Sequence, residues 1–76
     1  YFGHLYLYEE ILYVADACCV HAITEYGKYL WKSAYVGIDG VIVQEVTALA
    51  VNGIGEMDPP GGWVPFSLNP VTGKLQ

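Results

Sequence analysis

Two stretches of the chain decide its fold: LYLYEEILYVAD at residues 5–16 and VIVQEVTALAVN at residues 41–52. Each is followed by an apolar run and then by a Gly-Lys pair, Gly27-Lys28 in the first copy and Gly73-Lys74 in the second. Self-similarity at a spacing of about 20–50 residues indicates a repeated supersecondary unit. The sequence therefore predicts two copies of one unit, residues 4–33 and 41–76, within a single domain of residues 1–76.

Alternation of apolar and polar residues, with many β-branched and aromatic side chains, predicts a four-stranded antiparallel meander in each copy. The expected strands of the first copy are 4–8, 11–16, 19–24 and 28–33. Lys28 and Lys32 mark the solvent face of the last strand. We expect the opposite face, with Tyr29, Trp31 and Ser33, to be buried.

In the second copy we expect strands at 41–46, 48–55 and 63–68, and a short final strand from Lys74. Pro65 lacks a backbone donor, which predicts an edge strand or a bulge at its position. The fold class that follows is all-β: two antiparallel four-stranded meanders packed as a small sandwich or partial barrel.

Three segments of the first copy, LYVAD at 12–16, AIT at 22–24 and GKYLW at 27–31, resemble the blade repeat of pyrroloquinoline-quinone-type β-propellers. The second copy matches in SLNPVTGK at 67–74. In that family a tryptophan docks blade against blade around a closed ring, with the quinone and a calcium ion on the axis. Two repeats cannot close such a ring, and Thr24 stands where the repeat usually has Asp. The resemblance therefore implies blade-like meanders. Because of these departures from the repeat, we expect no cofactor.

The composition predicts self-association. Hydrophobic residues make up 54% of the 76 residues and charged residues only 14%, against about 25% charged in ordinary domains. A domain of this size buries only about 60% of its unfolded surface. The chain therefore has more apolar surface than it can hide alone, and we expect a homo-oligomer, most simply a homodimer.

The net charge and the two cysteines indicate which partners and which cellular compartment to expect. The net charge is −5, with three lysines and no arginine, so neither nucleic acid nor an anionic membrane surface is an expected partner. No apolar run approaches the ~20 residues of a membrane helix.

Cys18 and Cys19 are adjacent and cannot form an ordinary disulfide framework, so we expect two reduced thiols and a reducing, cytoplasmic compartment.

An enzyme is the alternative to a binding protein. His21 is the histidine of the third expected strand, and a catalytic histidine needs a carboxylate within about 3 Å, in a cleft. The carboxylates considered for this role are Asp16, Asp39, Glu56 and Asp58. If one of them meets His21 in a cleft, the residue types fit a small hydrolase or a metal-dependent enzyme.

The loop from Glu56 to Trp63 is the main candidate for recognition. It is longer than the equivalent connection at Ala17-Cys18, and extra residues at one of two equivalent turns are a common way to add a binding surface. The candidate binding residues are Trp63, Asp58, Glu56, Pro59, Pro60 and His21. The sequence thus favours a non-enzymatic protein-interaction or small-ligand-binding protein, with a hydrolase or a blade pair from a larger propeller as alternatives.

Overall fold

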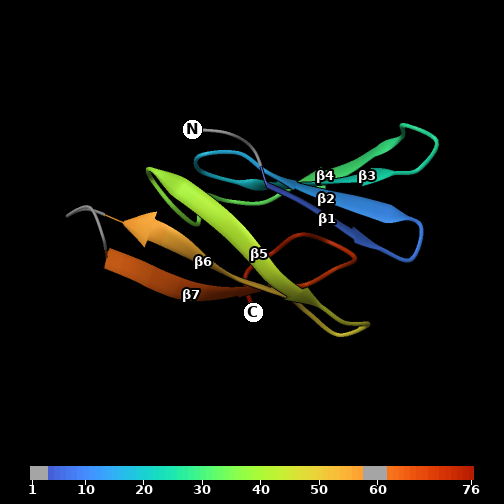
Figure 1. The fold of residues 1–76 in the computed structure, drawn as a ribbon. Coiled ribbons are helices and arrows are strands. Elements are labelled where there is room, and N and C mark those ends of the chain that lie inside the picture. Colours follow the sequence, from blue (N-terminus) through green and yellow to red (C-terminus); the bar gives the residue numbers. More distant parts are fainter. Residues whose placement is uncertain (1–3, 58–61) are drawn as a thin grey trace.

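The computed structural model describes residues 4–57 and 62–76. These residues form seven strands and no helix, arranged in two antiparallel sheets (Figure 1). The first sheet has the order β1-β2-β3-β4 and the second the order β5-β6-β7. The strands are β1 (His4–Tyr8), β2 (Ile11–Ala15), β3 (Val20–Thr24), β4 (Tyr29–Lys32), β5 (Gly40–Val46), β6 (Val51–Met57) and β7 (Gly62–Leu68). The predicted all-β fold class is confirmed.

The first sheet is the predicted four-stranded meander, and its strand ends agree with the expected ranges to within one residue. Its β3–β4 turn closes where the backbone N–H of Gly27, at φ 87°, donates to the carbonyl of Thr24 at 2.9 Å. Glycine adopts this left-handed conformation without the steric cost that a side chain adds. The local turn chemistry and the alternation therefore specify the same hairpins.

The prediction that Tyr29 lies on the buried face with Trp31 is wrong. The β3–β4 ladder pairs Ala22 with Trp31 but Ile23 with Tyr29, because the register shifts between Ala22 and Ile23. Such an irregularity inserts one residue and reverses the side-chain alternation beyond it. Trp31 stays buried, whereas Tyr29 is 53% exposed and meets His21 on the outer face.

The second sheet departs from the prediction at both ends. β6 begins at Val51, three residues later than expected, because Thr47 Oγ1 accepts the N–H groups of Leu49 and Ala50 and holds those residues in a turn. The expected fourth strand from Lys74 is wrong, since that segment contributes only an isolated bridge between Leu68 and Leu75. The second sheet therefore has three strands.

The proline of β7 is placed as predicted. Pro65 lies opposite Ile54 in the β6–β7 ladder, and β7 is an edge strand of the second sheet. A residue without an N–H is tolerated there because one side of an edge strand has no ladder partner.

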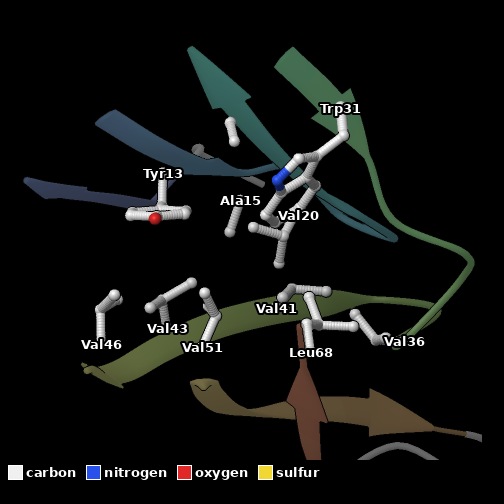
Figure 2. Close-up of a cluster of buried hydrophobic side chains, with 11 residues drawn as sticks. Tyr13, Ala15, Val20, Trp31, Val36, Val41, Val43, Val46, Val51 and Leu68 are labelled. Carbon is white, nitrogen blue, oxygen red and sulfur yellow. The ribbon is translucent and has the colours of Figure 1, made fainter. Parts of the chain in front are cut away.

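The two sheets pack face to face and are not closed into a barrel (Figure 1). Figure 2 shows inner side chains of the first sheet pointing at the valines of the second. The buried hydrophobic cluster consists of Tyr13, Ala15, Val20, Ala22, Trp31, Val36, Val41, Val43, Val46, Val51 and Leu68. The core is thus one layer of side chains between two sheets, which is the arrangement of a small sandwich.

Trp31 anchors one sheet to the other. Its Nε1 donates to the carbonyl of Pro70 at 2.9 Å, and its ring lies 6.0 Å from that of Tyr13. The same ring packs so close to Gly73, at φ 76°, that a Cβ there would come within 2.3 Å of it. Glycine at 73 therefore serves both the turn and the docking of the indole.

Candidate functional site

One face of the first sheet is left uncovered by the second sheet. Because side chains alternate along a strand, the residues between the buried ones point away from the second sheet. The pairing puts them in two rows across the sheet: Leu5, Val14, His21 and Lys32 in one, and Leu7, Leu12, Ile23 and Tyr29 in the other. Leu5 is 62% and Leu7 66% exposed. We call these eight residues the outer face; six of them are apolar or aromatic.

A chain of three polar side chains crosses one corner of the outer face. His21 Nε2 lies 2.7 Å from Asp16 Oδ2, and His21 Nδ1 lies 2.6 Å from the hydroxyl of Tyr29. The imidazole is thus held at both nitrogens. Which nitrogen carries the proton in the neutral ring follows from these bonds: a carboxylate only accepts, so Nε2 donates to Asp16, and the Tyr29 hydroxyl donates to Nδ1.

Asp16 is fixed by the backbone as well as by His21. Its Oδ1 accepts the N–H groups of Cys18 at 2.8 Å and Cys19 at 2.7 Å, in the turn that leads from β2 to β3. Burial raises the pKa of Asp16, but the hydrogen bonds from His21 and from these two N–H groups outweigh it. The pKa of Asp16 therefore falls from 3.8 to about 2, and the carboxylate is ionised at neutral pH.

The hydrolase alternative meets one of its two requirements. Asp16 lies within 3 Å of His21, as that alternative demands. The pair lies on an open sheet face, with 51% of the Asp16 side chain exposed, and His21 does not line the cleft described below. No group of three or more potential metal ligands occurs in residues 4–57 and 62–76.

The structure separates the candidate binding residues into two places. Trp63 is 40% exposed and lies directly opposite Glu56 in the β6–β7 ladder, so these two candidates share one end of the second sheet. His21 lies on the other sheet. Asp58, Pro59 and Pro60 lie outside the described residues, and so does most of the loop that we expected to form a binding rim.

A cleft of about 930 Å³ is lined in part by the β1–β2, β3–β4 and β5–β6 turns. Figure 1 shows these three turns at the same end of the molecule. The lining residues of the cleft are Tyr8, Glu9, Glu10, Ile11, Tyr13, Thr24, Tyr26, Thr47, Ala48, Pro70 and Val71. Tyr13 is 1% exposed and forms its floor, while Tyr26 is 87% exposed and stands at its rim. The pKa of Tyr13 is raised by burial first and then by Tyr8 and the negative charge of Glu9. The negative charge of Glu9 therefore acts on Tyr13 at the floor of the cleft.

Sequence reasoning missed this cleft, although it identified Glu9-Glu10 as a turn. The residues that line it come from turns far apart in the chain, and only the packing of the sheets brings them together. One local signal was present in the sequence: a two-residue turn of Glu9-Glu10 has none of the Gly, Asn or Asp that such turns favour. Glu9 accordingly has a φ of 55°, the positive region that side chains disfavour.

The remaining sequence expectations concern cysteines and membranes. Cys18 and Cys19 are both free thiols, and burial raises the pKa of Cys19. Cys18 Sγ lies 3.6 Å from the carbonyl of Ile38. Over the two described ranges, the structure holds no helix whose length and apolar character would suit a bilayer span.

Comparison with known proteins yields no relative. No protein-family model matches the chain, and neither the curated proteins nor the solved structures include a significant match.

Proposed function

We propose that this chain is a non-enzymatic interaction protein that forms a homodimer through the outer face of its first sheet. The observation that carries the proposal is the outer face, where six of eight residues are apolar or aromatic and the two leucines at one edge are more than 60% exposed. An antiparallel sheet that faces water normally carries polar residues on that side. A contiguous apolar face instead marks a surface that is covered by a partner.

The charge distribution favours a second copy as that partner. The chain carries a net charge of −5, so two copies repel each other unless they meet where carboxylates are few. The four strands of the first sheet contain no acidic residue, and Lys32 is their one fully charged side chain. Two copies therefore bury mostly apolar side chains at this face, and the carboxylate at its corner, Asp16, is hydrogen-bonded to His21.

The size of the face predicts a weak dimer. Strands of five residues span about 16 Å and four strands span about 19 Å, which gives a flat area of roughly 300 Å². Stable complexes bury about 800 Å² on each partner. We therefore expect a dissociation constant in the high micromolar range, below about 1 mM.

Methyl NMR on the wild-type chain at different concentrations tests this proposal. Between about 20 µM and about 1 mM, which bracket the expected dissociation constant, we expect the methyl signals of Leu5, Leu7 and Leu12 to move with concentration. The methyl signals of the buried Val43 serve as the control and stay fixed. Concentration-dependent shifts confined to Val64 and Val71, which are also exposed, would contradict the proposed interface.

A second candidate function is that of two blades from a larger propeller. It is supported by Trp31, which packs on Gly73 and donates to the carbonyl of Pro70. The tryptophan of the propeller blade repeat similarly docks one blade against the next. In that case the outer face stacks on a further repeat of the same protein. The genomic sequence on either side of the coding segment distinguishes the two: further copies of the repeat support the propeller, and their absence favours the homodimer.

A further inference from the structure

The cleft between the sheets has the size of a small-molecule site. Its volume of about 930 Å³ falls within the roughly 300–1,000 Å³ of typical ligand pockets. Its walls come from the first sheet and from the turns that follow β5 and β7, and the bond from Trp31 to the carbonyl of Pro70 holds part of one wall in place. It lies on the inner side of the first sheet, away from the outer face proposed for dimerisation.

The lining selects for a positive charge. The aromatic lining residues are Tyr8 and Tyr26, which are partly or fully exposed, and Tyr13, which is 1% exposed. The charged lining residues are Glu9 and Glu10, and no lysine or histidine is among the lining residues. An ammonium ion is attracted to the faces of aromatic rings and to carboxylates alike. An anion would meet only repulsion from the two glutamates.

The backbone supports a role for Glu9 beyond that of a turn residue. Its φ of 55° is the one positive φ recorded for a residue other than glycine in the described part of the chain. A side chain in that region costs about 1–2 kcal/mol relative to glycine. The chain thus carries a carboxylate at the cleft where glycine would make a less strained turn, and such strain concentrates at binding sites.

We propose that the cleft lined by Tyr8, Tyr13, Tyr26, Glu9 and Glu10 binds an organic ammonium ion, with the cation between the aromatic rings and the carboxylates at the mouth. The apolar part of the ligand rests on Ile11 and Val71, which line the same cleft. This site is independent of the proposed dimer, since it uses the opposite side of the first sheet.

An NMR titration with choline and with its uncharged carbon isostere, 3,3-dimethylbutan-1-ol, tests the charge requirement. We expect choline to shift the backbone amides of Glu9, Glu10 and Tyr26, and the alcohol to bind about tenfold more weakly, since the cation–ring attraction is lost. Equal binding of the two compounds would overturn the proposal in favour of a merely apolar cleft. No shift with choline would overturn it altogether.

Two charge-matched variants locate the carboxylate. Glu9→Gln and Glu45→Gln each remove one negative charge, but only Glu9 lines the cleft, whereas Glu45 is exposed on β5. We expect Glu9→Gln to weaken choline binding at least threefold and Glu45→Gln to leave it unchanged. Equal weakening by both would show that net charge, not the cleft, attracts the cation.

Glu9→Gly separates binding from stability. Glycine fits a φ of 55° without strain, so this variant should unfold at the same or a higher temperature than the wild-type chain. We expect it to bind choline as weakly as Glu9→Gln does. Wild-type affinity in a folded Glu9→Gly variant would overturn the role of Glu9.

Discussion

The two faces of the first sheet are made of similar residues and have opposite surroundings. On the inner face Tyr13, Ala15 and Val20 are at most 1% exposed, whereas Leu5 and Leu7 on the outer face are more than 60% exposed. The strands themselves contain no acidic residue, and Asp16 lies at one corner of the outer face, hydrogen-bonded to His21. A sheet that is apolar on both sides is suited to burial on both sides. The second sheet covers the inner face, and our proposal is that a second copy of the chain covers the outer face.

The largest effect is expected where the inner face docks on the second sheet. An alanine Cβ at position 73 would come within 2.3 Å of the Trp31 ring, whereas Gly27 has nothing within 4 Å of the equivalent atom, and both glycines have a positive φ. Gly27→Ala therefore reports backbone strain alone, about 1–2 kcal/mol. We expect Gly73→Ala to lower the free energy of unfolding by roughly 2–3 kcal/mol more, because Trp31 must move.

Chemical denaturation of the two glycine variants measures that difference. Equal losses in Gly27→Ala and Gly73→Ala would mean that the indole does not anchor the inner face as described. Unfolding should change the fluorescence of Trp31. If that change is lost in Gly73→Ala but kept in Gly27→Ala, the indole ring has left its site in the Gly73→Ala variant.

A smaller effect is expected at the polar corner of the outer face. The pKa of Asp16 is lowered in the folded chain from 3.8 to about 2, so the unfolded chain takes up the proton first as the pH falls. The stability that Asp16 contributes is complete above about pH 4 and is lost between about pH 4 and pH 2. Because the carboxylate is half-exposed, we expect about 1 kcal/mol.

Asp16→Asn tests this pH dependence. Asparagine keeps an oxygen for the N–H groups of Cys18 and Cys19 but loses the charge, so the variant should lose the step between pH 4 and pH 2 in its free energy of unfolding. His21→Ala should reduce the same step, since it removes the donor to Asp16 Oδ2. An unchanged step in both variants would show that Asp16 is not its origin.

These differences also show how far the sequence predicts the molecule. The alternation of apolar and polar residues predicts the strand ends of the first sheet to within one residue. It does so because every second residue of such a strand is buried, which gives the sequence a period of two. The bulge that moves Tyr29 leaves no mark in that period. The turn at Asn69, where Oδ1 accepts the N–H of Val71 at 2.8 Å, leads into a segment that contributes only the bridge between Leu68 and Leu75 in place of the expected strand.

The candidate sites were predicted less well, for a related reason. His21 and Asp16 were named from residue type, and the turn at Cys18 and Cys19 brings them together. The cleft combines the turns at Glu9, Tyr26 and Ala48 with Pro70, and their proximity depends on how the two sheets pack. Such long-range assembly is not encoded in any local pattern.

Sedimentation equilibrium of the wild-type chain beside a Leu7→Lys variant tests the central claim most directly. Leu7 is 66% exposed, so the substitution should change the free energy of unfolding of the monomer by no more than about 0.5 kcal/mol. We expect the wild-type chain to show a monomer–dimer equilibrium and Leu7→Lys to weaken it at least tenfold. A wild-type chain that stays monomeric up to millimolar concentration, or a dimer that Leu7→Lys leaves intact, would contradict a homodimer formed through the outer face.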